Sequence, residues 1–315
     1  MTAARSDAPT TPDQLRVVYI AGAKHCGSTL LDTMLGSTPG ARSLGEAAGF
    51  FRYRPDQACA CGEPPRDCTA CVSALRSVEA RAAPGDFERA SRMPLKERRA
   101  HWLVMGTKAR RRYAALADVV LESAAATSGC RVLIDSSKNA SRAAALAAAS
   151  RCDVRVVHVV RDGRGYLRSR QSRAEAEGTR HVVPLEMLSW LFKNLLIGSL
   201  LARRLPPGRY IICRYEDLIS DPRRTLARIC AFAGLDGTGL VDAATTGRGV
   251  RRGHLYEPAR RVDYRWVRLD PTRLRTQRET PVRNALFWVL GGFVSSRWGY
   301  DRVQSYLPDA AAGEH

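Results

Sequence analysis

The stretch RVVYIAGAKHCGSTLLDTML, residues 16–35, decides the fold of this chain. It opens with RVVYI, a β-branched and aromatic run that is typical of a buried strand. A glycine-containing loop, AGAKHCGS, follows, and the apolar spacing of TLLDTML from Thr29 to Leu35 is that of a helix. A strand that passes through a tight loop into a helix is the building unit of an α/β sheet, so residues 16–35 predict that class of fold.

Three further strands are predicted along the chain, each followed by a polar loop and a helix. They are RVLID at Arg131–Asp135, VRVVHVV at Val154–Val160 and YIIC at Tyr210–Cys213. Repeated strand–helix units predict a doubly wound α/β fold, with a central, mainly parallel sheet flanked by helices in three layers. Because ligands of such sheets bind at the carboxyl ends of the strands, the loops that follow these strands are the candidate site.

The chain of 315 residues is long enough for one large α/β domain, which we expect over residues 15–303. Residues 1–14 are rich in Pro, Thr and Asp and are predicted to be a disordered tail, and residues 304–315 a C-terminal tail. Residues 49–84 carry four Cys, several Pro and few periodic apolar positions, so we interpret them as an irregular, Cys-rich insertion. Helical patterning returns over residues 94–128.

The chain is strongly basic, with 50 Lys and Arg against 31 Asp and Glu and a formal net charge of +19. A nucleic-acid surface, an anionic ligand such as a nucleotide, and an Arg-rich solvated exterior all fit this charge, and composition does not separate them. Lys is the scarce basic residue, so the positions of the lysines are more informative than the total charge. The five lysines are Lys24, Lys96, Lys108, Lys138 and Lys193.

The sequence gives no sign of a membrane span or of export. The longest apolar run near the C-terminus, residues 285–296, is shorter than the ~20 residues that a membrane-crossing helix needs. The N-terminus lacks the apolar core of a signal peptide, so we expect a cytoplasmic protein. Nine Cys, an odd number, are spread unevenly over the chain, which favours reduced thiols over a disulfide scaffold.

The loop GAKHCGST, residues 22–29, has the Gly-x4-Gly-Ser-Thr spacing of a phosphate-binding loop but lacks the Lys that nucleoside-triphosphate loops place directly before Ser or Thr. Backbone N–H groups and the positive end of the helix dipole still point at an anion bound there. Six residues are the candidate ligands: Lys24, His25, Cys26, Gly27, Ser28 and Thr29. The alternative is an ordinary strand-to-helix turn capped by Ser28.

A second anion-binding motif is VRDGRGYLRSR, residues 160–170. Arg161 lies at the end of a predicted strand, and Ser169 lies eight residues later, about two helical turns into the next segment. A guanidinium and a hydroxyl that converge on one phosphate recognise it well. The alternative is a solvated, Arg-rich helix face.

Three segments together, HCGSTLL, VVRDGRGYLRS and RYEDLISDPRRTLARICAFAGL, resemble the sulfotransferases that use 3'-phosphoadenosine 5'-phosphosulfate. The resemblance is closest to the bacterial and tyrosylprotein-type branch, and it runs from about residue 16 to residue 235, with weaker similarity to residue 300. It implies a P-loop-like sulfotransferase fold. It also implies transfer of a sulfuryl group from this co-substrate to a hydroxyl of a small-molecule, glycan or lipid acceptor, without a catalytic metal.

The resemblance also implies roles for single residues. In the family the first loop holds the 5'-phosphosulfate, and the Arg and Ser that correspond to Arg161 and Ser169 hold the 3'-phosphate. Arg260, in the segment RGHLYEPARR, is a further candidate for the 3'-phosphate.

Four residues are the catalytic candidates, because sulfuryl transfer needs cations and a base more than a covalent nucleophile. Glu46, in SLGEAAG, corresponds to a catalytic Glu of the tyrosylprotein-type members and is the candidate base, with an exposed loop Glu as the alternative. Lys138 is implied to reach the sulfuryl group. The family usually has Lys or Arg two residues before the loop Gly, where this chain has His25 after Lys24, and either residue is a candidate for that role.

Two other motifs remain outside this scheme. Cys59, Cys61, Cys68 and Cys71 have the spacing C-x-C-x6-C-x2-C, which is within reach of one tetrahedral Zn²⁺, although the first pair is closer than in zinc fingers. We therefore favour a reduced, or occasionally disulfide-linked, loop over a structural zinc site. RYEDL, followed by Asp221 and Pro222, is interpreted as a structural turn that opens a helix.

Two other functions were weighed against sulfotransfer. A nucleotide-dependent kinase or phosphotransferase is disfavoured by the missing Gly-Lys-Ser/Thr. A basic nucleic-acid-binding protein is disfavoured because no aromatic platform, finger or recognition helix is evident. The sequence leaves open whether the protein forms a homodimer.

Overall fold

The computed structural model describes residues 14–48, 59, 63–64, 66–81, 83, 85, 106–180, 182–251, 266–275 and 280–304. The predicted tails, residues 1–14 and 304–315, lie almost wholly outside these ranges.

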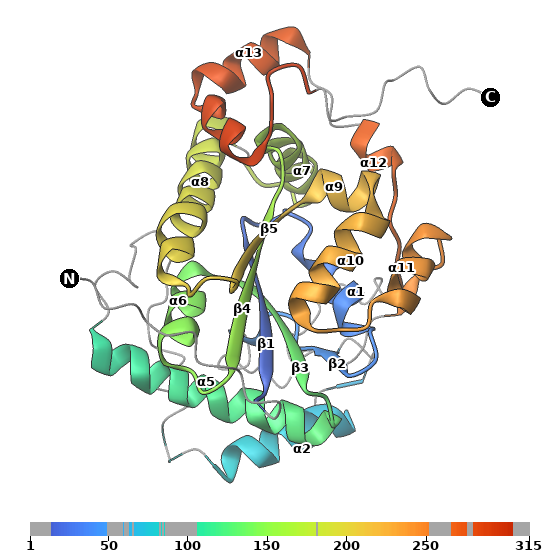
Figure 1. The fold of residues 1–315 in the computed structure, drawn as a ribbon. Helices are drawn as coiled ribbons and strands as arrows, with labels where there is room; N and C mark the ends of the chain where they lie inside the picture. The colour runs from blue at the N-terminus through green and yellow to red at the C-terminus, as the bar shows by residue number, and fades with distance from the viewer. Residues whose placement is uncertain are drawn as a thin grey trace.

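Five parallel strands form the central sheet of the described residues, in the order β2-β3-β1-β4-β5 (Figure 1). Their bounds are Arg16–Gly22 for β1, Ala41–Ser43 for β2, Val132–Lys138 for β3, Asp153–Val160 for β4 and Tyr210–Arg214 for β5. The four predicted strands are present, and the predicted class, an α/β fold around a mainly parallel sheet, is confirmed. The short edge strand β2 was not predicted, because its three residues ARS carry no apolar run.

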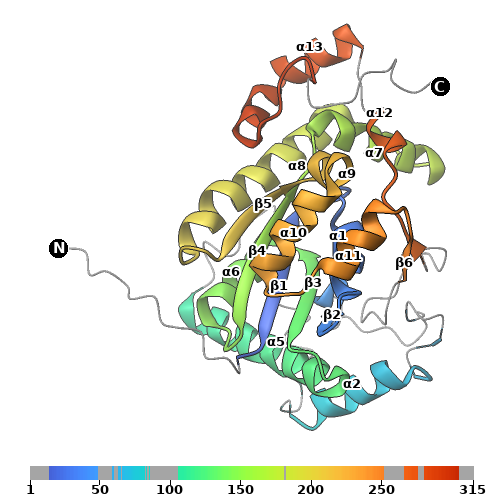
Figure 2. The ribbon, with the colours of Figure 1, turned by 45° about the vertical axis from the view of Figure 1, so that its right-hand side comes forward.

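Helices cover both faces of this sheet, which makes three layers (Figures 1 and 2). Side chains alternate along β1, so Val17 and Tyr19 are buried with one set of helices and Val18 and Ile20 with the other. The first set is α5, Thr107–Ser128, and α6, Ala140–Ala149; the second set is α1, Ser28–Gly36, α10, Pro222–Ala233, and α11, Thr238–Thr245.

A third apolar cluster joins the later helices. It includes Tyr166, Trp190, Phe287 and Trp298, all buried. Three helices surround it: α7 (Gly163–Ala176), α8 (Val183–Leu195) and α13 (Pro281–Val289). Helix α8 continues as a π-helical segment, Leu196–Leu201, and a 3-10 turn, Ala202–Arg204. Helix α13 is followed by the 3-10 turn Gly292–Trp298. The remaining elements are α9, Tyr215–Ser220, α12, Thr272–Arg275, and the antiparallel pair β6, Val250–Arg251, and β7, Trp266–Val267.

The interpretation of residues 49–84 as irregular is wrong for part of that range, because Thr69–Glu79 forms helix α2, which packs against α5. Cys71, Leu75 and Val78 recur at helical spacing along it and lie on its buried side. With Cys71 counted as a metal ligand or thiol and not as an apolar residue, this stripe is not visible in the sequence.

Two helix starts follow the sequence signals closely. Asn139 caps α6 by accepting a hydrogen bond from the Arg142 backbone N–H at 3.0 Å, as expected of an Asn directly before a helix. Asp221 caps α10 by accepting from the Arg224 N–H at 3.1 Å, with Pro222 as the first helical residue.

One helical stretch of the described residues, Val183–Arg204, is long and apolar enough to pass a length-and-composition test for a membrane span, with a mean hydropathy of 1.3. Core helices of soluble proteins pass the same test, and Met187, Trp190 and Asn194 of this stretch are buried inside the protein. The expectation that the chain has no membrane span therefore stays a prediction.

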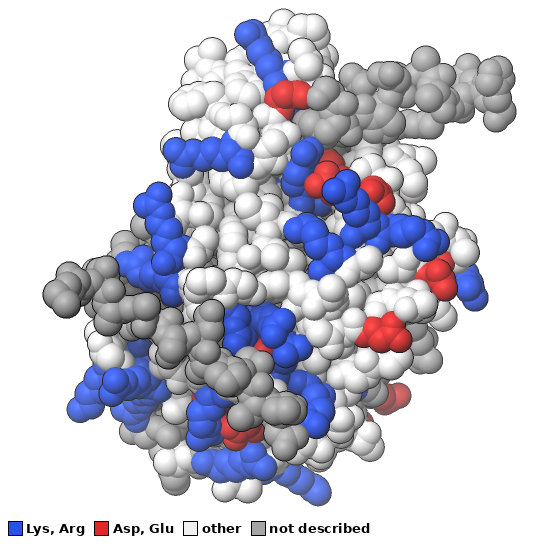
Figure 3. Space-filling view, in the orientation of Figure 1, with Lys and Arg blue, Asp and Glu red and all other residues white. Residues whose placement is uncertain are grey.

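The distribution of the basic side chains can be followed on one face of the described residues. On the face drawn in Figure 3, Lys and Arg lie in several separate groups over different elements. On this face, an Arg-rich exterior therefore accounts for much of the positive charge.

Candidate functional site

The loop between β1 and α1, residues 23–27, is shaped by two glycines. A Cβ on Gly22 would lie 2.5 Å from the Val159 carbonyl oxygen, so only glycine lets β1 end this close to β4. Gly27 has φ 96°, and a Cβ there would lie 2.5 Å from the ring of Tyr215. Gly27 is also the N-cap of α1 and no side chain caps this helix, so the alternative of a turn capped by Ser28 does not hold. The N–H groups of the first turn of α1 therefore follow directly on a tight loop, as in an anion site.

Arg161 and Ser169 converge on this loop from β4 and α7. Arg161 Nη1 donates to the His25 carbonyl oxygen at 3.2 Å, and its guanidinium lies over the ring of Tyr215, 4.5 Å from the centroid. Ser169 Oγ lies 3.3 Å from His25 Nδ1. Arg161 and Ser169, which lie eight residues apart and were predicted to act together, thus both contact His25 of the first loop.

His25 is neutral at neutral pH. Burial, followed by the positive charges of Arg170 and Arg161, lowers the pKa of His25 to about 4. Arg170 Nη1, which can only donate, faces Nε2 at 3.4 Å, so we assign the ring hydrogen to Nδ1, which donates to Ser169. Of the two candidates for the loop cation, His25 is therefore uncharged at neutral pH, and both of its ring nitrogens have partners on α7.

Lys24 is the exposed cation of the loop. Its pKa is lowered, first by partial burial and then by the positive charges of Lys193 and Arg170, while Glu46 opposes this shift. Lys24 makes no ion pair in the part of the chain that the structure describes. The positive groups around it create a potential that an anion would relieve.

Lys138 and Glu46, predicted separately as stabiliser and base, form an ion pair between Nζ and Oε1. Lys138 ends β3, and Glu46 follows β2, the strand next to it in the sheet. Lys138 Nζ also donates to the Ser136 carbonyl oxygen at 3.2 Å. The Glu46 side chain is 38% exposed and that of Lys138 14%, so the carboxylate is open to solvent while the ammonium is held.

His25 and Lys138 share an unusual backbone. Both have positive φ, 61° and 63°, and within the described ranges only one other non-glycine residue, Gln304, does so. Such a conformation costs about 1–3 kcal/mol and persists where the surrounding structure enforces it. The strain thus coincides with two of the catalytic candidates.

The other predicted ligands of the first loop differ in access. Cys26 is buried, and burial raises the pKa of its thiol, so the thiol stays protonated. Ser28 is buried at the start of α1, and Thr29 is exposed one residue later. Arg260 lies outside the described residues.

RYEDL, interpreted from the sequence as a structural turn, also helps to build the site. Tyr215 fills the space beside Gly27 and stacks under Arg161. Glu216 is buried, accepts from the Asp162 N–H at 3.2 Å, and has the Tyr300 hydroxyl 2.7 Å from Oε2. The position of RYEDL in the sequence could have indicated this role, because Tyr215 and Glu216 directly follow β5, whose carboxyl end lies near the β1–α1 loop.

Burial, and next the negative charge of Asp162, raises the pKa of Glu216 to about 7, from an ordinary value of 4.5. Between these two values the folded protein holds a proton that the unfolded chain has lost, so stability falls as the pH rises through this window. We expect Glu216→Gln to remove this fall, which amounts to about 3 kcal/mol in the free energy of unfolding. Urea titrations of both proteins from pH 4 to pH 8 measure it.

His158 serves as the internal control for this experiment. It is fully buried between Tyr210 and Asn194, and burial lowers its pKa from 6.5 to about 4, so its contribution is lost as the pH falls through that range. This acid-side loss should be the same in wild type and Glu216→Gln. If the free energy of unfolding of the two proteins changed with pH in the same way from pH 4.5 to pH 7, Glu216 would not titrate as described.

The sequence and the fold both resemble those of known proteins. The sequence matches the sulfotransferase family over residues 18–238. The chain belongs to the sulfotransferase family. The matched region begins in β1 and ends at the start of α11, so it contains the first loop, Glu46, Lys138 and the Arg161–Ser169 segment. The match favours sulfotransfer over the kinase and nucleic-acid alternatives.

Solved sulfotransferases share the fold. The sulfotransferase domain from the Synechococcus PCC 7002 olefin synthase superposes with a TM-score of 0.51 at 20% identity, covering 93% of this chain and 98% of that domain. The sulfotransferase domain from the curacin biosynthetic pathway has a TM-score of 0.51 at 16% identity, covering 93% of this chain and 99% of that domain. No curated protein matches the sequence. At these identities the structures support the fold alone.

Proposed function

We propose that this sulfotransferase takes the sulfuryl group from 3'-phosphoadenosine 5'-phosphosulfate and transfers it to a hydroxyl of a small-molecule, glycan or lipid acceptor. The observation that carries the proposal is the convergence of Arg161 and Ser169 on His25 of the β1–α1 loop. A nucleotide with one phosphate at each end of its ribose needs two anion sites side by side, one in the loop and one beside it.

The donor set fits an anion. Arg161 Nε is buried and has no hydrogen-bond partner among the described residues, although a buried donor of this kind is normally satisfied. Tyr215 fixes the plane of this guanidinium. An oxygen of the 3'-phosphate would satisfy the donor and gain a charge-assisted bond.

The chemistry falls to the Lys138–Glu46 pair. The co-substrate supplies the sulfuryl group and a phosphate leaving group. Lys138 stabilises the negative charge that develops between them, and Glu46 accepts the proton of the acceptor hydroxyl. Their contact links the two roles, because Glu46 is released to accept a proton when Lys138 turns toward the sulfuryl oxygens. Lys24, at the rim, adds positive charge near the leaving phosphate.

Calorimetry with 3'-phosphoadenosine 5'-phosphate and with 5'-AMP tests the donor site. If Arg161 binds the 3'-phosphate, Arg161→Ala should weaken binding of the bisphosphate by roughly 10- to 100-fold, as expected for a hydrogen bond to a charged group. Binding of 5'-AMP, which lacks that phosphate, should change little. Ser169→Ala should show the same pattern with a smaller loss.

Arg223→Ala is the matched control, because Arg223 is exposed on α10 and also removes one positive charge. Equal losses for both nucleotides in Arg161→Ala would contradict a 3'-phosphate site at this residue. Binding of MgATP in preference to the bisphosphate would contradict the choice of donor.

A further inference from the structure

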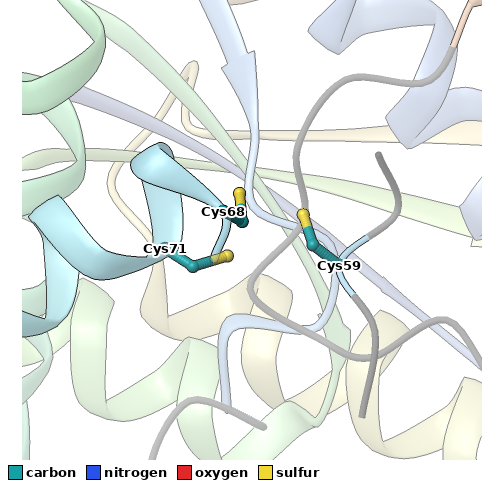
Figure 4. Close-up of side chains that lie close together, drawn as sticks. All are labelled: Cys59, Cys68 and Cys71. Atoms are coloured by element: carbon teal, nitrogen blue, oxygen red, sulfur yellow. The ribbon is translucent and has the colours of Figure 1, made fainter. Parts of the chain in front are cut away.

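A cluster of three cysteines lies away from the residues proposed for sulfotransfer. Cys59, Cys68 and Cys71 place their sulfurs within 4.8 Å of one another, and all three residues are buried, with 2%, 2% and 5% of their surface exposed. Figure 4 shows Cys68 and Cys71 approaching from α2 and Cys59 from the facing segment. All three are free thiols.

The backbone holds this arrangement in place. Cys68 is the N-cap of α2 and Cys71 lies in its first turn, so the C-x2-C spacing brings both side chains to one side of the helix start. The Cys68 N–H donates to the Pro64 carbonyl oxygen at 2.9 Å, and the Cys59 N–H donates to the Glu63 carbonyl oxygen at 2.8 Å. These two backbone hydrogen bonds fix Cys59 and Cys68, so the three sulfurs are held together at the start of α2.

The spacing of the sulfurs identifies the ligand class. Thiolates around one tetrahedral Zn²⁺ at ~2.3 Å lie roughly 3.8 Å from one another, within the observed limit. In an iron–sulfur cluster three cysteines do not all bind the same iron, so at least two of their sulfurs lie further apart than around a single Zn²⁺. A buried, all-sulfur set on a helix start is typical of structural zinc.

We propose that Cys59, Cys68 and Cys71 bind one structural Zn²⁺ as thiolates, which releases their three thiol protons. The ion ties Cys59 to the start of α2, and α2 packs against α5 of the main core. Cys61, the fourth cysteine of the sequence motif, lies outside the described residues. The proposal is independent of the sulfotransferase chemistry, since none of these cysteines belongs to the β1–α1 loop or to the Lys138–Glu46 pair.

Metal analysis of the purified full-length protein tests the site. We expect about one zinc per chain, and replacement by Co²⁺ should give the absorption of thiolate-to-cobalt charge transfer. Cys68→Ser and Cys71→Ser should each lose most of the zinc. Cys130→Ser is the matched control, because Cys130 is a free, half-buried cysteine outside the cluster and should leave the zinc content unchanged.

A variant that misfolds would also lose metal, so wild-type protein is examined in parallel. Chelation of wild type should release the zinc, and readdition should restore both the zinc content and the Co²⁺ spectrum. Folded wild type that contains no zinc and gives no cobalt–thiolate absorption would overturn the proposal. So would a Cys68–Cys71 disulfide found by mass spectrometry of protein prepared under reducing conditions, or the visible spectrum of an iron–sulfur cluster.

Discussion

Glu46→Gln is expected to lower kcat by roughly 100- to 10,000-fold, the range for loss of a general base, while leaving the affinity for 3'-phosphoadenosine 5'-phosphate nearly unchanged. Glutamine keeps the size and one oxygen of the side chain, but it cannot take the proton of the acceptor hydroxyl. Single-turnover assays with labelled donor and any acceptor that supports turnover measure the chemical step, and calorimetry measures binding.

Lys138→Met should lower kcat by a similar factor, because the ammonium that neutralises the transferred group is lost. Since Lys138 and Glu46 contact each other, the double variant should lose far less than the product of the two single losses. Lys108→Met is the matched control, because Lys108 is exposed on α5. Full activity of Glu46→Gln would remove Glu46 from the mechanism, and independent losses would remove the coupling.

Gly27→Ala is expected to disable the donor site and destabilise the fold together. An L residue at positive φ costs about 1–2 kcal/mol, and the overlap of the new methyl with the Tyr215 ring adds about 1–3 kcal/mol. Because Tyr215 supports Arg161, its displacement should also weaken binding of 3'-phosphoadenosine 5'-phosphate at least tenfold. Denaturant titration and calorimetry measure the two effects.

Gly40→Ala separates the overlap from the backbone cost. Gly40 also has positive φ, 76°, but a Cβ there would meet nothing within 4 Å. Gly40→Ala should therefore lower the free energy of unfolding only by the backbone contribution and should keep its affinity for the nucleotide. Identical behaviour of the two variants would show that Tyr215 does not constrain the loop.

The strands and helices that carry long apolar runs could be predicted from the sequence, and so could the convergence of Arg161 with the loop, since the carboxyl ends of neighbouring parallel strands meet. The strand β2 could not, because three residues such as ARS form a strand only beside an existing edge. The ion pair of Lys138 with Glu46, 92 residues apart, depends on which strands become neighbours, and that order is not written in any local pattern.

The pKa values of the site residues could not be predicted from the sequence either. A histidine in a loop has an ordinary pKa until the fold buries it and brings Arg170 and Arg161 against it from a distant part of the chain. Glu216 looked like a turn residue because burial and the contact with Tyr300, 84 residues away, exist only in the folded protein. Composition and spacing identify side chains that carry charge, whereas the pKa of each depends on its folded surroundings.

The positive φ of His25 and Lys138 sets stability against activity at those two positions. Glycine at either position would relieve the backbone and make the fold easier to maintain, but it would also remove the imidazole that meets Ser169 or the ammonium that meets Glu46. Selection for a robust fold alone would therefore favour glycine at both positions. A histidine and a lysine at these two strained positions fit the proposed site, in which function is obtained at the expense of stability.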